Sequence, residues 1–195
     1  MARKAENKMA QRQIIPTLIG AGITERWYFS HLKKLLNLKM QIRPRFFGDE
    51  HIHVLEKNVE TVLATEGHAI VVFDVAVMQW NDVERKRLET FRKKYAREKR
   101  VMICESMPSI EYWFLLHYVA TNKHLGTSKA AIEELRKHIP QFEKTERFLH
   151  NPKWVADIEA DGRLQLAMQR AEQFAHTGES FTDVWQVLKA LLSQN

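Results

Sequence analysis

The chain has 195 residues, a formal net charge of +6 and a hydrophobic fraction of 45%. This length suits one domain with an appended helical piece, and the apolar fraction argues against global disorder. Its single cysteine, Cys104, excludes an internal disulfide framework and a multi-cysteine zinc site. No apolar run approaches the roughly 18 residues of a membrane-spanning helix, so we expect a cytoplasmic protein with no membrane partner. The basic excess is compatible with a nucleic-acid partner but does not require one.

The first half of the sequence is predicted to alternate strands and helices. In order, the pattern predicts a basic solvated tail at 1–12, a strand at 14–19, a helix at 24–38, an edge strand at 41–47 and a helix at 49–65. Proline cannot donate to a strand ladder, so Pro44 places the second strand at an edge. The unbroken apolar run 69–73 is typical of a central parallel strand with both faces covered, and it ends at Asp74.

The second half is predicted to be mainly helical. The pattern predicts a helix at 83–95, a short buried strand at 101–104 that contains Cys104, and helices at 109–119, 128–138, 163–176 and 182–192. The helix at 83–95 is highly charged, which favours a solvated outer helix over a nucleic-acid-binding surface. Ser180 and Asp183 resemble a capping box. The predicted fold class is α/β, with a mainly parallel sheet flanked by helices and a helical C-terminal extension.

The turn after the first strand is the first candidate site. Gly20 and Gly22 allow a ligand to approach the backbone, and Thr24 and Glu25 open the following helix, with Thr24 as a plausible N-cap. The free N–H groups of a helix start favour an anion, so we expect phosphate binding at these four residues. The alternative is a strand-to-helix turn that binds no ligand.

Asp74 is the strongest single candidate. A carboxylate that ends a buried parallel strand lies at the ligand-binding edge of the sheet, beside the first turn if the two strands are neighbours. Mg²⁺ prefers such oxygen ligands, although one aspartate is too few to hold it tightly. The alternative interpretation is an aspartate that caps a turn or the next helix.

Glu111 and His117 are unusual, because they lie in an otherwise apolar predicted helix. Burying either side chain without a partner is costly, so each should have a partner or face the site. Glu111 in the first helical turn also suits the helix dipole, and His117 also suits a core histidine bonded to a backbone carbonyl. His51 and His53 form a pair without a third ligand, which we interpret as a surface coincidence.

Three motifs follow one another in the order of a known family. Gly20 to Glu25 with the aromatic pair Tyr28-Phe29 is the first, residues 71–76 ending in Asp74-Val75-Ala76 are the second, and residues 106–117 are the third and most specific. They resemble the RloB-like proteins, a family with a TOPRIM-type domain. Its corresponding motifs are Glu-Gly with Thr-Glu and an aromatic pair, Asp-x-Asp, and Ser-Asn-Pro-x-Phe-Glu-x-Trp-Leu-Leu-His. Residues 142–144 and 182–184 also fit loosely.

This resemblance implies a TOPRIM-like (Rossmann-like) domain at 13–125 with the helical extension at 126–195 packed on it. TOPRIM domains use a Glu and an Asp-x-Asp to bind Mg²⁺ or Mn²⁺ for cleavage, rejoining or synthesis of DNA or RNA strands. The family is associated with phage-defence and restriction loci, which implies nucleic acid and a partner protein of the same system as partners. By position, the implied residues are Ala21, Glu111 and His117 for catalysis and Asp74 and Ala76 for the metal.

Two departures from the family pattern change the expected activity. Ala21 stands where the family has its glutamate, and Ala76 stands where it has the second aspartate. A methyl group cannot ligate a metal ion, and two-metal chemistry needs several anionic oxygens. We therefore expect weak or no metal binding and little nuclease activity, through natural degeneration or deliberate replacement. The alternatives are a non-catalytic module that binds nucleic acid or a nucleotide, and a fold with a purely protein partner.

Overall fold

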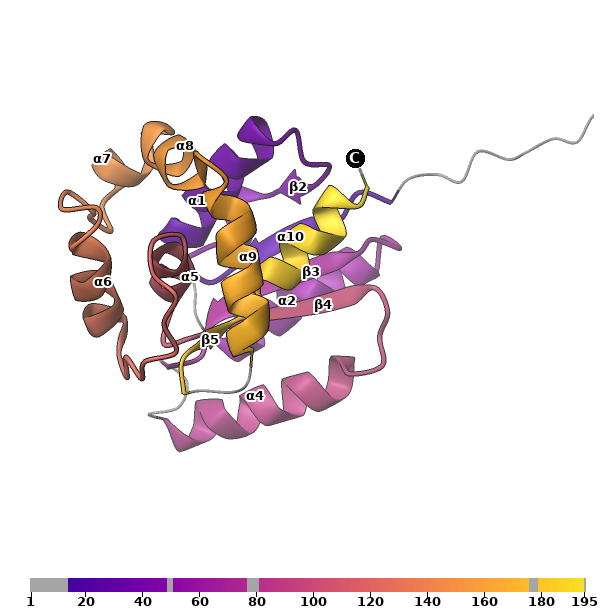
Figure 1. The fold of residues 1–195 in the computed structure, drawn as a ribbon. Coiled ribbons are helices and arrows are strands. Elements are labelled where there is room, and N and C mark those ends of the chain that lie inside the picture. The colour runs from indigo at the N-terminus through magenta and orange to yellow at the C-terminus, as the bar shows by residue number, and fades with distance from the viewer. Residues whose placement is uncertain (1–13, 49–50, 77–80, 176–178, 195) are drawn as a thin grey trace, which may run out of the picture.

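A five-stranded sheet forms the centre of the computed structural model, which describes residues 14–48, 51–76, 81–175 and 179–194 (Figure 1). The strands lie in the order β2-β1-β3-β4-β5 across the sheet. Their bounds are β1 (Thr17–Gly20), β2 (Gln41–Ile42), β3 (Ala69–Asp74), β4 (Val101–Met107) and β5 (Phe181–Thr182). All pairs are parallel except β4 with β5, which is antiparallel. The predicted α/β fold with a mainly parallel sheet is confirmed.

Strand β3 lies at the middle of the sheet, as its apolar run predicts. It pairs with β1 on one side and with β4 on the other, and all six of its residues are buried. Both faces of this strand are covered, so the side chains on both faces are apolar, which explains its continuous hydrophobic sequence. Cys104 on the neighbouring strand is fully buried, as predicted.

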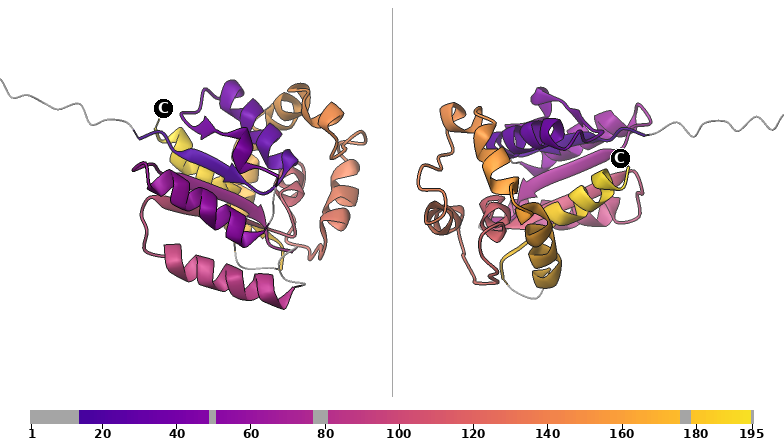
Figure 2. Two further views of the ribbon diagram at one scale, coloured as in Figure 1. Left: turned by 180° about the vertical axis from the view of Figure 1, so that it is seen from behind. Right: turned by 45° about the horizontal axis from the view of Figure 1, so that its top comes forward.

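Helices cover both faces of this sheet (Figure 2). Their bounds are α1 (Ile23–Leu35), α2 (Ile52–Leu63), α4 (Asp82–Tyr95), α5 (Glu111–Leu116), α6 (Ser128–Arg136), α7 (Glu146–Leu149), α8 (Lys153–Glu159), α9 (Arg163–Phe174) and α10 (Val184–Leu192). Side chains of α2 and α4 pack with Ile19, Val71 and Phe73 in one cluster. Those of α1, α5 and the C-terminal helices pack with Leu18 and Val72 in a second, larger cluster. The alternation of strand side chains between faces separates the two clusters.

The C-terminal helices share a hydrophobic core with the sheet. The larger cluster contains Leu18 of β1 together with Val155 of α8, Leu164 of α9 and Leu188 of α10. The extension therefore covers the face of the sheet opposite to α2 and α4. A division of the chain between residues 125 and 126 stays a prediction.

Helix α4 is a charged outer helix whose N-terminus is capped by Asn81, the side chain of which accepts hydrogen bonds from the backbone N–H groups of Val83 and Glu84. Several of its basic side chains pair with carboxylates of the same protein. The pairs are Arg85 with Asp82, Arg87 with Glu84, Arg92 with Glu105, and Lys94 with Glu56 and Glu60. These ion pairs are typical of a solvated outer helix, which was the favoured interpretation of the sequence.

Several predicted element bounds differ from those in the structure. The predicted edge strand at 41–47 ends after Ile42, since Pro44 to Phe46 forms a single 3₁₀ turn. The helix predicted at 24–38 ends at Leu35, and Asn37 adopts a left-handed conformation with φ of 52°. The helix predicted at 109–119 is helical only from Glu111 to Leu116. Strand β5 and helix α7, which have only two and four residues, are too short to leave a periodic pattern.

The capping box predicted from Ser180 and Asp183 is also wrong. The Ser180 hydroxyl accepts a hydrogen bond from the backbone N–H of Leu125 instead, and α10 begins only at Val184. Asp183 accepts hydrogen bonds from the backbone N–H of Glu105 and from the Gln186 side chain. These two residues therefore fix the β5 segment against β4 and the loop before α6.

Two further expectations are limited by the part of the chain that the structure covers. The predicted basic tail at 1–12, residues 49 and 50 of the helix predicted at 49–65 and residue 176 of the helix predicted at 163–176 lie outside the described residues. Among the described residues, none of the helices has the length and apolar character needed to cross a bilayer.

Candidate functional site

The carboxyl ends of β1, β3 and β4 meet at one edge of the sheet. Gly20 of β1 is in register with Val72, and the ladder continues beyond it, because the Ala21 N–H donates to the Val72 carbonyl at 3.1 Å. On the other side of β3, Asp74 is in register with Ser106, and the Val75 N–H donates to the Ser106 carbonyl at 2.9 Å. The first turn and Asp74 are therefore neighbours, as expected for adjacent parallel strands.

The turn after β1 is tightly packed around its glycines. A Cβ added to Gly20 would lie 2.2 Å from the Phe47 ring, so the missing side chain makes room for that ring. A Cβ on Gly22 would lie 2.6 Å from a Glu25 carboxylate oxygen, so this carboxylate covers the start of α1. An anion is thus already present at the positive end of the helix dipole. Phosphate binding at Gly20, Gly22, Thr24 and Glu25 stays a prediction.

Thr24 is not the N-cap of α1, contrary to the sequence-based expectation. Gly22 occupies the N-cap position with an extended backbone, and Thr24 is the second helical residue. Its side chain is buried, and among the described residues its hydroxyl oxygen has no hydrogen-bond partner. A buried hydroxyl without a partner is uncommon in folded proteins, which makes Thr24 the least satisfied polar group of this turn.

Asp74 lies at the end of β3 and holds the start of α5. Its Oδ1 accepts a hydrogen bond of 2.9 Å from the backbone N–H of Ile110, the residue immediately before that helix. Burial, together with the nearby carboxylates of Glu25 and Glu111, raises the pKa of Asp74 well above its usual value, although Lys144 and the Ile110 N–H oppose this shift. The hydrogen bond to Ile110 is the one expected of a capping aspartate, and a role in binding metal stays a prediction.

Glu111 is completely buried at the first position of α5 and has several partners. Its Oε2 accepts hydrogen bonds from the hydroxyl groups of Ser109 at 2.6 Å and Ser128 at 3.2 Å. Its Oε1 lies 3.1 Å from the ammonium group of Lys144. The burial cost of this carboxylate is therefore offset by two donors and one cation.

Lys144 is the site residue that sequence reasoning missed. It lies between α6 and α7 in the helical extension, and its side chain is 38% exposed. Desolvation lowers its pKa, but the carboxylates of Glu111, Asp74 and Glu25 outweigh that effect and the pKa is raised. The only signal in the sequence was the loose family resemblance of residues 142–144, because a single lysine in a polar segment has no pattern of its own.

Ala21 and Ala76 lie close to the end of the same strands but pack among apolar side chains. Both are buried, at 3% and 5% exposure, in one hydrophobic cluster that also contains Phe73 and Val75. Within the described residues, no group of three or more His, Cys, Asp or Glu side chains is arranged to hold a metal ion. The residues present at this edge therefore do not fit a Mg²⁺ site, and the exposed His51 and His53 do not form one either.

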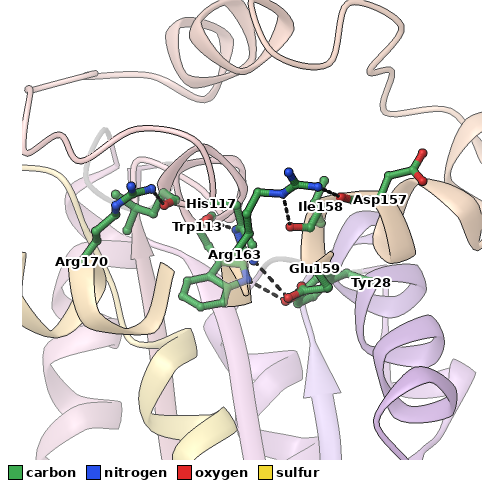
Figure 3. Close-up of polar contacts among 9 residues, drawn as sticks. Tyr28, Trp113, His117, Asp157, Ile158, Glu159, Arg163 and Arg170 are labelled. Atoms are coloured by element: carbon green, nitrogen blue, oxygen red, sulfur yellow. Dashed lines mark hydrogen bonds and ion pairs between the residues drawn. The ribbon is translucent and has the colours of Figure 1, made fainter. Parts of the chain in front are cut away.

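His117 belongs to a separate polar network inside the helical layer (Figure 3). Its Nδ1 donates to the Trp113 carbonyl at 3.0 Å, and its Nε2 lies 3.2 Å from Glu159 Oε2. The Tyr28 hydroxyl donates to Glu159 Oε1 at 2.8 Å and accepts from the Trp113 indole at 2.7 Å. The hydrogen bond to a backbone carbonyl is that of a core histidine, and these contacts do not join His117 to Asp74 or Glu111. A catalytic role for His117 stays a prediction.

Two surface hollows lie away from these residues. One, of about 460 Å³, is lined by Trp27, His31 and Val155 among others, and the second, of about 560 Å³, by residues of α7 and α8. None of the predicted site residues lines either hollow.

Comparison with known proteins gives one clear result. Comparison with curated proteins gave no significant match, and comparison with solved structures gave none either. The family model of the RloB-like proteins, however, matches residues 18–191, which include all strands and helices described above except for the last residue of α10 and the first of β1. The chain therefore belongs to the RloB-like protein family.

Proposed function

We propose that this RloB-like chain carries the edge of a TOPRIM-type, Mg²⁺-dependent nuclease site from which two metal-binding carboxylates are missing. The observation that supports this proposal is the position of Ala21, Asp74 and Ala76, which follow or end two neighbouring parallel strands at one edge of the sheet. Ligands of open α/β sheets bind at that edge. The chain as given is proposed to be inactive, and its role is in a phage-defence or restriction-type system with nucleic acid as the partner.

Inactivity follows from the chemistry of the residues present. Mg²⁺ is held by carboxylate, phosphate and water oxygens in near-octahedral geometry. Asp74 offers such oxygens, but one of them already accepts the Ile110 N–H, and the methyl groups of Ala21 and Ala76 offer none. The proposal does not depend on whether the two alanines arose naturally or by replacement.

The experiment is to restore the two acids and to measure cleavage. The variant Ala21→Glu/Ala76→Asp is incubated with single- and double-stranded DNA and RNA in Mg²⁺, in Mn²⁺ and in a chelator. We expect metal-dependent cleavage of at least one substrate, and no cleavage by the unaltered chain. A matched control adds Asp74→Asn to the restored variant and should abolish cleavage. Failure of the folded, restored variant to cleave any of these substrates would contradict the proposal.

A second candidate function is a non-catalytic module that binds nucleic acid or a nucleotide. The burial of Ala21 and Ala76 in a hydrophobic cluster favours it, because neither methyl group can ligate a metal ion for catalysis. The net charge of +6 predicts that the unaltered chain binds polyanions with an affinity that falls as salt rises. Binding of labelled DNA and RNA over a salt series tests this. An absence of binding at low salt would favour a protein partner from the same defence system instead.

A further inference from the structure

A surface hollow lies between helix α1 and helix α8, and we call it the α1–α8 hollow. Its volume is about 460 Å³. Helix α1 contributes Trp27, His31 and Leu35 to its wall, and α8 contributes Val155 and Ala156. This volume lies within the range of about 300–1,000 Å³ that is usual for small-ligand pockets. The hollow is therefore large enough for a small planar group.

The aromatic rings of the α1–α8 hollow are held in place by contacts within the protein. The Trp27 indole N–H donates to a Glu146 carboxylate oxygen at 3.1 Å, and the indole stacks on His31 with 5.4 Å between ring centroids. His31 Nε2 in turn donates to the Leu149 carbonyl at 2.9 Å. The exposed His150 ring lies nearly perpendicular to the indole, with 4.7 Å between centroids. Aromatic walls that are already ordered lose little conformational entropy when a flat ligand binds.

The ionisable side chains that line this hollow are all bases. They are Lys34, His31 and His150, and no acid is among the described lining residues. The hollow beside α7 and α8 differs, because Glu143 and Asp157 line it. Burial lowers the pKa of His31, and the charges of Lys34 and His150 act in the same direction against the hydrogen bond to a backbone carbonyl. The α1–α8 hollow therefore combines a neutral aromatic wall with the exposed ammonium group of Lys34, which suits a planar group next to a negative charge.

The hollow lies on the helix whose start belongs to the proposed site. Gly22 is the N-cap of α1, and Trp27 is its fifth residue, about 8 Å further along the helix axis. We propose that the α1–α8 hollow binds an unstacked base of a single-stranded nucleic acid and that Lys34 contacts the adjoining phosphate. The inference rests on the proposed function in one point, which is that nucleic acid is the partner.

The chemistry of single strands supports this choice of ligand. Every base has a planar π-face, and proteins that bind single strands combine aromatic side chains for stacking with basic residues along the backbone. The hollow offers both, with Trp27 and His150 as the rings and Lys34 as the cation. A base within a duplex is stacked on its neighbours and cannot enter, so the hollow selects unpaired bases.

Strands with and without bases test the proposal. The unaltered chain is titrated at low salt with labelled single strands of DNA and RNA and with an abasic strand of the same length and charge. We expect the base-bearing strand to bind about fivefold tighter or more, because stacking contributes about 1–3 kcal/mol per base. Equal affinities would overturn the inference and leave nucleic acid as the partner. Binding of no strand would contradict the proposed partner, and the inference with it.

Filling the hollow locates the base. Ala156→Trp adds an indole from an exposed position of α8, and Ala96→Trp, exposed at the end of α4 on the other side of the sheet, is the matched control. We expect Ala156→Trp to bind the base-bearing and abasic strands equally, with its affinity for the abasic strand unchanged, and Ala96→Trp to keep the preference. A preference that survives in a folded Ala156→Trp would overturn the inference.

A second pair of variants covers the case in which Ala156→Trp does not fold. Leu35 is 48% exposed at the end of α1, so Leu35→Glu places a negative charge at the hollow, and Leu35→Gln is its neutral control. We expect Leu35→Glu to bind the base-bearing strand more weakly than Leu35→Gln. Equal affinities of these two variants would overturn the inference.

Lys34→Gln tests the phosphate contact. It should weaken the binding of base-bearing and abasic strands alike and reduce the slope of log affinity against log salt by about 0.7. Lys57→Gln, at an exposed position of α2, is the control. Equal slopes for the two variants would overturn the role of Lys34. Size-exclusion chromatography tests the other occupant: a dimer of the unaltered chain that Ala156→Trp separates would mean that a second copy fills the hollow, and would overturn the inference.

Discussion

Two buried polar regions of this molecule differ in how fully their polar groups are paired and shielded from solvent. In the network inside the helical layer, His117, Glu159, Tyr28 and Trp113 satisfy one another, and the side chains of His117 and Glu159 are 0% and 3% exposed. At the edge of the sheet, the buried Glu111 carboxylate pairs with Lys144, whose side chain is 38% exposed, and the buried Thr24 hydroxyl has no described hydrogen-bond partner.

This difference distinguishes two kinds of environment for polar groups that look alike in the sequence. A closed network in which each group has its partner stabilises the packing of helices and leaves no group free for a ligand. An edge with a solvent-accessible counter-charge and an unsatisfied hydroxyl retains groups that can exchange partners. Of the two ionisable residues in the apolar segment that forms α5, Glu111 lies at the edge of the sheet and His117 lies in the network of the helical layer.

The largest expected effect on stability comes from a substitution in the polar network of the helical layer. Replacing His117 with Ala removes the partner of a buried Glu159 carboxylate, and breaking a buried pair in this way costs about 3 kcal/mol. Urea unfolding measures this loss, and His53→Ala, at an exposed position, serves as the control with little expected change. A His117→Ala variant that keeps its stability but loses nucleic-acid binding would reverse the assignment of the two regions.

Substitutions of Asp74 test the polar region at the edge of the sheet. Asp74→Ala leaves the buried Ile110 N–H without an acceptor and is expected to cost about 2 kcal/mol of unfolding free energy. Asp74→Asn keeps the acceptor oxygen and removes a charge repelled by Glu25 and Glu111, so it should be nearly neutral. Chemical denaturation of both variants checks this, and equal losses would mean that the charge, rather than the hydrogen bond, matters for folding.

Gly20 tests whether the first turn is shaped by packing. Gly20→Ala brings a methyl group against the Phe47 ring, and this overpacking should cost about 1 kcal/mol. The double variant Gly20→Ala/Phe47→Leu makes room for the methyl group and should recover part of the loss in thermal unfolding. A stable Gly20→Ala that binds nucleic acid less well would instead indicate that a ligand approaches the backbone there.

The smallest expected effect is a dependence of stability on pH. The pKa of Asp74 is raised in the folded protein, so its contribution to stability is fully present below the ordinary pKa of an aspartate and is lost as the pH rises through the raised value. The stability of Asp74→Asn relative to the unaltered chain should therefore increase with pH. Parallel urea titrations measure the difference, and a difference that falls with rising pH would contradict the shift.

The sequence predicted much of the fold because its long elements carry strong patterns. The apolar run of β3 indicated a central strand, and the stripe of Leu88, Phe91 and Tyr95 indicated the helix α4. The errors fall on short or mixed segments: Pro44 begins a 3₁₀ turn, and Phe181 and Thr182 form a strand whose two residues gain their ladder partners only from β4. Tertiary contacts, and not local propensity, define such elements.

The candidate site was predictable only in part. The rule that parallel strands expose their carboxyl ends at one edge correctly made the Asp74 strand a neighbour of the first turn, and the cost of burying charge singled out Glu111. Neither rule could find Lys144, which reaches the edge from a segment 33 residues after Glu111 through the packing of the extension. Nor could they show that Glu25, rather than a ligand, covers the start of α1.

The binding of a divalent cation to the acid-restored chain tests the central claim most directly. Isothermal titration with Mg²⁺ or Mn²⁺ is carried out on the unaltered chain, on Ala21→Glu/Ala76→Asp and on the same variant with Asp74→Asn. The account predicts no measurable binding to the unaltered chain, binding to the restored variant, and loss of that binding when Asp74 is neutralised. A folded restored variant that binds no metal, or an unaltered chain that binds equally well, would contradict the claim that positions 21, 74 and 76 belong to one metal site.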